Sequence, residues 1–449
     1  MRMIVWSFVI IFCIHKTPGY GQIVSHLLSI DEPKGALTPK SIVHNGNGVF
    51  AAQNMMYNHS ICFYDRSFDL IKMLEDKVKL SDYGFCDLDH WYQGSPVECD
   101  FSSDGRFAFV SNYKLYGKGF RSDADDNCKL NGEHERGYIY KIDTDNFQIV
   151  EVFEVGSVPK YVYYLDGYNL LAVSNWCSGT VSLIDLNQGK TIHEIAVGAY
   201  PRGLAFYKGQ LLVGIMGDDK VVSIDLKGGE ITQKFEVGEG PRDLHVDSGN
   251  DLLYISLNNE NALAVYDLRQ KKIKAKRCLG QLPRSMALSE NGQWLFVCLY
   301  GENKVVMLEA SNAKILSKIT SCYKPIGIEY DDEKNQLWVA CYGGEISIYS
   351  VTIDPLSAKN DFVDNEILSM DQSPDEEGNN QTVIVCGSFR EKRNAENRME
   401  VLREMGIEAT ISSGNPYFRV YVSVEKEEAQ EKKRAMQQKL GFELWLHRQ

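Results

Sequence analysis

One short phrase returns through the middle of the chain at nearly constant spacing, and it constrains the fold more than any other feature. Each clear copy is a Val-Gly or Leu-Gly pair followed three residues later by a proline, and a degenerate copy precedes the last proline. The prolines are Pro159, Pro201, Pro241, Pro283 and Pro325, at steps of 42, 40, 42 and 42 residues. Self-similarity at this period is typical of repeat architectures built from one supersecondary unit.

Two weaker copies, at Pro96 and Pro39, extend the series backwards. Their steps of 63 and 57 residues are interpreted as repeats that carry insertions. Within the unit that begins at Pro201, β-branched runs bounded by Gly, Asp and Asn predict four strands. These runs are residues 203–206, 211–214, 221–225 and 231–237. Four strands in each of seven units predict an all-β, seven-bladed propeller over residues 22–353.

The two ends of this region predict how the ring closes. The last unit has a third strand at residues 345–351 and then enters an acidic stretch, so it lacks a fourth strand. Residues 23–30 lie before the first proline and have no blade of their own. We therefore expect the N-terminal strand to complete the last blade.

The units resemble the YVTN-type β-propeller repeats of bacterial and archaeal surface proteins. Residues 171–175 (Leu-Ala-Val-Ser-Asn) and 180–185 (Thr-Val-Ser-Leu-Ile-Asp) stand where that family has its name-giving strand and its following V-x-V-I-D strand. The resemblance covers roughly residues 23–353. It implies a fold much more than a function.

The N-terminus has the pattern of an export signal, predicted to span residues 1–21. Met1 and Arg2 are followed by an apolar run at 3–14 that is too short to cross a bilayer, and by a small-x-small cleavage site at 19–21. Lipidation at Cys13 is the alternative. No later stretch is long enough to span a membrane, so we expect a soluble mature chain in the periplasm or associated with the cell envelope.

Charge and cysteine content narrow the possibilities further. The 48 basic and 61 acidic residues give a net charge of −13, which argues against nucleic acid as a partner. Export permits disulfides among the ten cysteines that follow the signal. Cys298 and Cys341, at equivalent inner-strand positions, are predicted to be buried and unpaired. Cys128 and Cys177, in neighbouring loops on one face, form the candidate disulfide.

A basic residue follows the repeat proline in five of the seven units: Lys40, Lys160, Arg202, Arg242 and Arg284. If each begins an innermost strand, the five encircle the mouth of the central channel, where they suit a carboxylate or phosphate group. The alternative is that each pairs with a nearby acid or is simply inherited with the repeat. Aromatic and amide residues at the ends of the second strands belong to the same face: Asn112, Asn175, Asn258, Tyr300 and Tyr342.

Catalytic motifs are absent from the sequence. No G-x-S-x-G, H-E-x-x-H or repeated histidine set occurs, so no catalytic residue, metal or cofactor is predicted. Glu98 and Asp243 are the only acids two residues after a repeat proline, which leaves a lactonase-like hydrolase as the alternative to a binding protein. The polar insertion at 114–135 lacks the spacing of a calcium loop and is predicted to be solvated.

Residues 354–381 are acidic, lack a sustained period and are predicted to be a flexible linker. After them, residues 382–449 show the order β-α-β-β-α-β, with helices at 392–405 and 426–440. This order predicts a small α+β, ferredoxin-like sandwich with one free sheet face.

The segment resembles a SPOR domain in Val-Ile-Val-Cys-Gly-Ser-Phe at 383–389, Tyr-Phe-Arg-Val at 417–420 and the closing Trp445. The resemblance implies binding to peptidoglycan glycan strands stripped of stem peptides, at sites of cell division. It implies glycan contacts from Ser388, Tyr417 and Arg419, with Val385 where many members have Gln. The leading hypothesis is thus a non-enzymatic envelope protein whose propeller binds a ligand or another envelope protein. A protein-interaction module without glycan affinity is the alternative for this domain.

Overall fold

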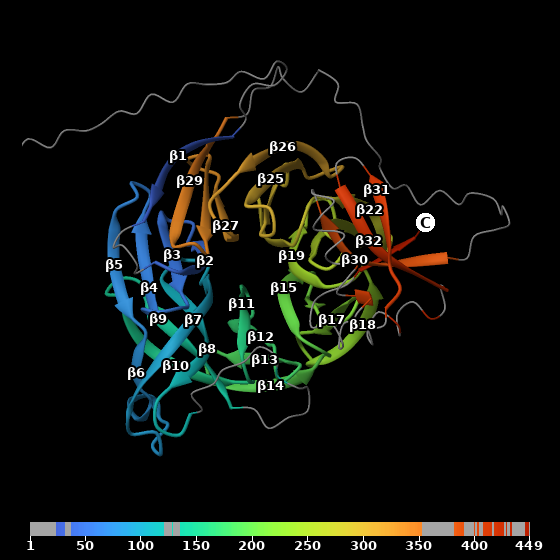
Figure 1. The fold of residues 1–449 in the computed structure, drawn as a ribbon. Helices are drawn as coiled ribbons and strands as arrows, with labels where there is room; N and C mark the ends of the chain where they lie inside the picture. Colours follow the sequence, from blue (N-terminus) through green and yellow to red (C-terminus); the bar gives the residue numbers. More distant parts are fainter. Residues whose placement is uncertain are drawn as a thin grey trace, which may run out of the picture. The chain divides into compact units, whose positions relative to one another are not determined.

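The structure is a computed structural model, and Figure 1 draws it as a ribbon. It describes residues 24–31, 37–120, 128, 135–352, 381–389, 399, 402–403, 407–414, 417–425, 428, 432 and 445–448. The chain divides into two compact units, residues 1–368 and 369–449.

The first unit is a seven-bladed propeller in its described part, which confirms the fold predicted from the repeat. Blade 1 contains β2 (Pro39–His44), β3 (Val49–Asn54), β4 (Ser60–Asp65) and β5 (Leu70–Glu75). Blade 2 is a five-stranded sheet of β6 (Lys77–Lys79), β7 (Trp91–Phe101), β8 (Phe107–Tyr116), β9 (Gly137–Asp143) and β10 (Gln148–Val155). A short 3-10 helix, η1 (Leu80–Tyr83), lies between β6 and β7.

Blades 3 to 6 follow the repeat without large insertions. Blade 3 contains β11 (Pro159–Leu165), β12 (Leu170–Asn175), β13 (Thr180–Asp185) and β14 (Lys190–Ala196). Blade 4 contains β15 (Pro201–Tyr207), β16 (Gln210–Ile215), β17 (Lys220–Asp225) and β18 (Glu230–Glu236). Blade 5 contains β19 (Pro241–Asp247), β20 (Leu252–Leu257), β21 (Ala262–Asp267) and β22 (Lys272–Cys278). Blade 6 contains β23 (Pro283–Leu288), β24 (Trp294–Leu299), β25 (Lys304–Glu309) and β26 (Lys314–Thr320).

Blade 7 joins the two ends of the repeat region and closes the ring (Figure 1). It contains β27 (Pro325–Asp331), β28 (Gln336–Cys341) and β29 (Glu345–Val351), and its outer strand is β1 (Val24–Ile30). Strands β1 and β29 are antiparallel, with Val24 opposite Val351 and Ile30 opposite Ile346. The predicted closure by the N-terminal strand is therefore confirmed. β1 thus pairs with the edge of β29 that a three-stranded blade would leave open.

The repeat proline begins the innermost strand in six blades, and a β-bulge follows it. The register to the second strand shifts immediately after Pro39, Pro159, Pro201, Pro241, Pro283 and Pro325. Proline cannot donate to the ladder, and a bulge re-aims the residues beside it. Blade 2 differs, because Pro96 lies within the longer strand β7 rather than at its start.

Apolar side chains fill the spaces between neighbouring blades. At the closing junction between blades 1 and 7, Trp338 is fully buried and its ring stacks on Phe50, with centroids 3.9 Å apart.

Truncation of Trp338 to alanine is expected to lower the free energy of unfolding by about 3–5 kcal/mol, because nothing refills the space. Denaturant unfolding of the full chain measures this. Trp91, which is 61% exposed, is the control, and Trp91→Ala is expected to cost about 0.5 kcal/mol or less. Equal losses in both variants would contradict the assignment of the core.

The second unit contains one described sheet in the order β31-β32-β30-β33. Its strands are β30 (Gln381–Phe389), β31 (Thr410–Gly414), β32 (Tyr417–Glu425) and β33 (Trp445–Arg448). The predicted helices lie mostly outside the described residues; Met399, Leu402, Arg403 and Lys432 are helical. The ferredoxin-like arrangement of this unit therefore stays a prediction.

Candidate functional site

The bulge after each repeat proline gathers the five predicted cations at one end of the propeller channel. We call this set the cationic collar: Lys40, Lys160, Arg202, Arg242 and Arg284. Lys160, Arg202 and Arg242 are only 4–6% exposed. Each residue is second in its innermost strand, so its position follows from the repeat itself.

The members of the collar act on one another electrostatically. Burial, and after it the charges of Arg242, Lys160, Arg202 and Arg284, hold the pKa of Lys40 well below its usual value. The pKa of Arg242 is also lowered, first by burial and then by Arg284 and Arg202. Like charges held together in a dry site disfavour ionisation, whereas an anion in the same place favours it. The collar is thus an electrostatically unfavourable arrangement that an anion would relieve.

Carboxylates and aromatic rings offset part of this charge. Arg202 Nη2 lies 2.5 Å from Glu98 Oε1, which is the ion pair that the alternative interpretation required for each cation. Arg242 contacts the sulfur of Met216 at 3.7 Å. Three further collar residues lie over aromatic rings: Lys160 over Tyr113 at 4.2 Å, Arg284 over Tyr300 at 4.4 Å and Lys40 over Tyr342 at 5.5 Å. Cation–π contacts attract a cation to the face of the ring.

A second band, made of acidic groups, lines a cavity of about 210 Å³ along the same innermost strands. Its carboxylic acids and histidine are Glu98, Asp100, Asp243, His245 and Glu329. Burial raises the pKa of Asp100 to about 7 and that of Glu329 to about 8. Asp243 differs: burial raises its pKa, but the hydrogen bond and charge of His245, the Met286 backbone N–H and the charge of Arg202 together bring it below its ordinary value. The pKa of His245 is lowered by burial and raised more by its hydrogen bond with Asp243 and the charges of Asp243 and Glu329, so that it ends above its ordinary value.

Asp100, His245 and Glu329 were not predicted from the sequence as site residues. A signal for them exists, because residues two and four positions after a repeat proline share one face of a strand. Asp100 is four residues after Pro96, His245 is four after Pro241, and Glu329 is four after Pro325. Searching both positions, instead of only the first, finds the whole band.

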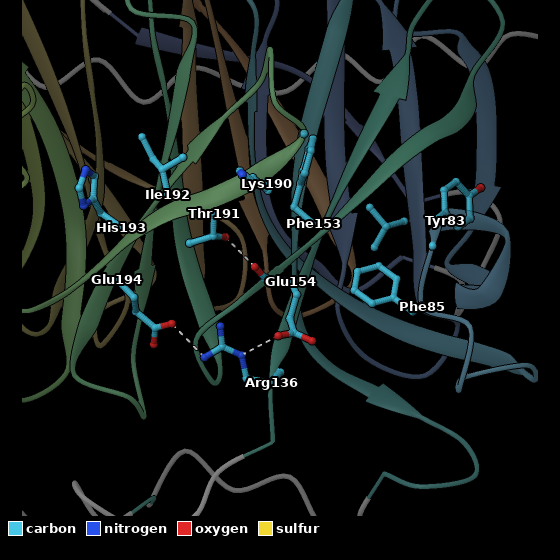
Figure 2. Close-up of a pocket in the computed structure, with 13 residues that line it drawn as sticks. Tyr83, Phe85, Arg136, Phe153, Glu154, Lys190, Thr191, Ile192, His193 and Glu194 are labelled. Atoms are coloured by element: carbon cyan, nitrogen blue, oxygen red, sulfur yellow. Dashed lines mark hydrogen bonds and ion pairs between the residues drawn. The ribbon is translucent and has the colours of Figure 1, made fainter.

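A separate groove lies between the outer strands of blades 2 and 3 (Figure 2). Its volume is about 530 Å³, and Tyr83, Phe85 and the residues 190–194 line it. Arg136 bridges Glu154 at 3.1 Å and Glu194 at 2.9 Å, as the dashed lines in Figure 2 show. Arg136, Glu154 and Glu194 are thus paired with one another, and we assign the groove no function.

Two disulfides occur among the described residues. Cys128 and Cys177, the candidate pair, are joined, with their Cα atoms 5.5 Å apart. The second joins Cys322 to Cys341, so the prediction that Cys341 is unpaired is wrong. The prediction for Cys341 considered only inner-strand positions, whereas its partner Cys322 lies in the degenerate copy of the repeat phrase. Cys298 is buried and free, as expected. The calcium alternative concerned residues that lie mostly outside the described ones.

The predicted glycan-contacting residues fall on one sheet face by register. Ser388 is opposite Arg419, and Val385 is opposite both Tyr421 and Trp445. Tyr417, Arg419 and Tyr421 alternate along β32 with Val420 and Val422, which are buried. By register, the backbone positions of the five predicted residues belong to one face of the sheet, and their role as glycan contacts stays a prediction.

These features define a class: a propeller with a charged channel, followed in the same chain by a small sheet domain. Residues 380–445 match the family model described as SPOR domain, so the chain carries a SPOR domain. Residues 220–315 match the model described as lactonase, 7-bladed beta-propeller. The SPOR match associates the protein with peptidoglycan and the cell envelope. The finer YVTN assignment of the repeats stays a prediction.

Solved structures that resemble the chain support the fold alone. Hydrazine synthase of Kuenenia stuttgartiensis aligns with a TM-score of 0.57 at 14% identity, covering 75% of this chain and all of that one. A chain of a mitotic checkpoint complex crystal structure aligns with a TM-score of 0.58 at 12% identity, covering 79% of this chain and all of that one. A search of curated proteins finds no match. Among the described residues, no helix is both long and apolar enough to cross a membrane.

Proposed function

We propose that this protein is an exported envelope protein that binds peptidoglycan glycan strands through its SPOR domain and an anionic ligand or partner through its propeller. The SPOR match over residues 380–445 carries the first half of the proposal. Export by the signal at residues 1–21, residence in the periplasm and action at division sites belong to the same proposal. The flexible linker at 354–381 and the domain boundaries on either side of it are also part of this proposal.

The glycan site is assigned to the face that carries Ser388, Tyr417, Arg419, Val385 and Trp445. Aromatic rings suit the C–H surfaces of sugars, and arginine and serine suit their carboxylate and hydroxyl groups. The register that brings Ser388 opposite Arg419 supports this assignment. Valine at position 385 offers no hydrogen bond, so binding relies on the neighbouring polar residues.

Sedimentation of the full chain with purified peptidoglycan sacculi tests the tether. We expect binding to rise after an amidase has removed the stem peptides. The double variant Tyr417→Ala, Arg419→Ala is expected to weaken binding at least about tenfold, or about 1.4 kcal/mol. Arg403→Ala is the matched control, because Arg403 is an exposed helical residue of the same unit. Unchanged binding by the double variant would refute the assigned face, and no binding by the wild-type chain would refute the tether.

The collar supports an anionic ligand for the propeller. Five cations converge there, and burial together with their charges lowers the pKa of Lys40 and Arg242 even though Arg202 is paired with Glu98. This is notable in a chain whose net charge is −13. Carboxylate and phosphate groups are the anions that arginine binds best.

A hydrolytic propeller is the second candidate, and the convergence of four carboxyl groups and His245 in the channel favours it. His245 Nε2 lies 3.5 Å from Asp243 Oδ2, and such a pair can hold a proton at the imidazole. The match of residues 220–315 to the lactonase propeller model points the same way. Turnover of a lactone or ester that is lost in Asp243→Asn separates this candidate from a binding-only propeller.

A further inference from the structure

Blade 7 differs from blades 4 to 6 at one contact between the repeat phrase and the second strand. In blades 4 to 6, the glycine three residues before the repeat proline packs against an aliphatic residue at the end of the second strand. A Cβ added at Gly238 or Gly280 would lie 2.7 Å from a methyl group of Leu257 or Leu299, and one at Gly198 would lie 3.3 Å from Ile215. The aliphatic side chain thus occupies the space that a larger residue would need.

Both partners of this contact are cysteines in blade 7. Cys322 lies three residues before Pro325, in the place of the glycine, and Cys341 pairs with Pro325, in the place of the aliphatic residue. The next residue in register, opposite Cys341 on β29, is Glu345. At that register position, blades 4 to 6 have Lys220, Ala262 and Lys304.

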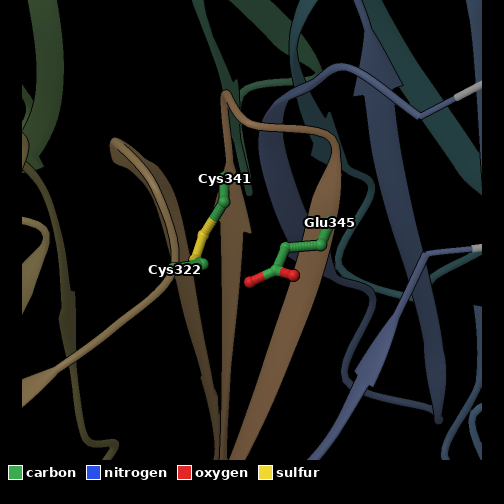
Figure 3. Close-up of side chains that lie close together, drawn as sticks. All are labelled: Cys322, Cys341 and Glu345. Carbon is green, nitrogen blue, oxygen red and sulfur yellow. A yellow bond between two sulfur atoms is a disulfide. The ribbon is translucent and has the colours of Figure 1, made fainter. Parts of the chain in front are cut away.

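The three side chains form a compact donor set (Figure 3). The two sulfur atoms and a carboxylate oxygen of Glu345 all lie within 4.8 Å of one another. Cys341 is fully buried and Cys322 is 8% exposed, while Glu345 is partly exposed. Among the residues that the structure describes, this is the group of three or more His, Cys, Asp or Glu side chains whose geometry suits a metal ion.

Neighbouring hydroxyl groups contact Glu345 and Cys322. Ser347 Oγ donates to Glu345 Oε1 at 3.1 Å, and Ser321 Oγ lies 3.5 Å from Cys322 Sγ. Tyr349 in turn donates its hydroxyl to Ser321 Oγ at 3.0 Å. No ion pair to Glu345 is found in the described part of the chain. A disulfide is uncharged and gains no electrostatic stabilisation from a neighbouring carboxylate. A cation bound by two thiolates is stabilised by it, because the carboxylate is a further negatively charged ligand.

We propose that Cys322, Cys341 and Glu345 form a site for a thiophilic divalent cation of the Zn²⁺ class when the cysteines are reduced. Two electrons and two protons from a dithiol break the S–S bond and leave two thiols, and the dithiol becomes a disulfide. The cation then displaces both thiol protons and is held by two thiolates and one carboxylate, with a fourth position for water. Cysteine and carboxylate ligands in tetrahedral arrangement are those that zinc prefers. Binding in place of the S–S bond would join the same two segments of the closing blade.

Cobalt(II) is the probe, since its thiolate complexes give a charge-transfer absorption band. The full chain is reduced with a phosphine, which takes up the oxygen of water, and is then freed of reductant under argon. We expect one equivalent of Co²⁺ to produce the band and one equivalent of Zn²⁺ to abolish it. Glu345→Gln is expected to keep both thiolates and to weaken metal affinity about 10–100-fold, by analogy with the loss of a supporting ligand.

Reduction also opens the Cys128–Cys177 disulfide, so a matched pair of variants is needed. The double variant Cys128→Ser, Cys177→Ser is expected to retain the band, and Cys322→Ser, Cys341→Ser is expected to lose it. A band that persists without Cys322 and Cys341, or its absence from the reduced wild-type chain, would overturn the proposal and leave a plain disulfide. If the second double variant fails to fold, the affinity of Glu345→Gln decides: an affinity equal to that of the wild-type chain excludes Glu345 as a ligand. The proposal depends on neither the glycan nor the anion site.

Discussion

Replacement of Arg242 by methionine is expected to make the full chain more stable in a buffer without multivalent anions, and less responsive to phosphate. Arg242 is 6% exposed, and burial together with Arg284 and Arg202 lowers its pKa. Methionine has a similar length and keeps an apolar contact with Met216. Replacing a buried charge that lacks full compensation by an apolar side chain stabilises proteins by up to about 1–4 kcal/mol.

Phosphate is expected to stabilise the wild-type chain more than the Arg242→Met variant. It stabilises the wild-type chain in proportion to its occupancy of the collar, by about 2.7 kcal/mol at a hundred times its dissociation constant, and stabilises Arg242→Met much less. Thermal unfolding at increasing phosphate concentration measures both effects, with a dicarboxylate series as the second arm. Lys272→Met, at an exposed position of blade 5, is the control for loss of a positive charge. If Arg242→Met is less stable than the wild-type chain and phosphate does not change the stability of the wild-type chain, the prediction is contradicted. That result would show that the charges of the collar are balanced by groups of the protein itself.

Much of the propeller was predictable because its constraints are local and repeated. The proline phrase marks where each innermost strand begins, and the missing fourth strand of the last unit identifies β1 as its partner. The same phrase predicted which five cations meet, since equivalent positions in a closed ring face one channel. What it did not predict was the extended strand around Pro96, because an insertion there replaces the turn that starts the strand in other blades.

The remaining differences concern contacts between units of the repeat. Cys341 was expected to be an inert buried thiol because the sequence aligned it with Cys298, but the register places Cys341 opposite Pro325, where blade 6 has Leu299 opposite Pro283. Its pairing depends on Cys322, whose position corresponds to a glycine in the sister blades. Asp100 and Glu329 were missed because acids were sought only two residues after each repeat proline, and these two lie four residues after it. They become a site only when seven strands bring them together, which is a property of the closed ring.

The acidic band is expected to make the protein lose stability as pH rises from about 5 to 8. The pKa of Glu329 is about 8 in the folded chain, raised above its ordinary value by burial. The folded state therefore binds one proton more than the unfolded state between these two values, and stability falls by about 1.4 kcal/mol for each pH unit. Asp100, with a pKa of about 7, and His245, with a raised pKa, act in the same direction. The window for Asp243 is different, because its lowered pKa places its loss of stability at acid pH.

Glu329→Gln measures how much of the pH dependence of the unfolding free energy comes from Glu329. Glutamine has nearly the same shape and stays neutral, so the difference in unfolding free energy between pH 5.5 and 7.5 is expected to shrink by about 3 kcal/mol. Urea unfolding of the full chain at the two pH values measures it. Glu230→Gln, at an exposed position of blade 4, is expected to leave the difference unchanged. If Glu329→Gln leaves the difference unchanged, Glu329 does not release a proton between these pH values in the folded chain, which would contradict its raised pKa.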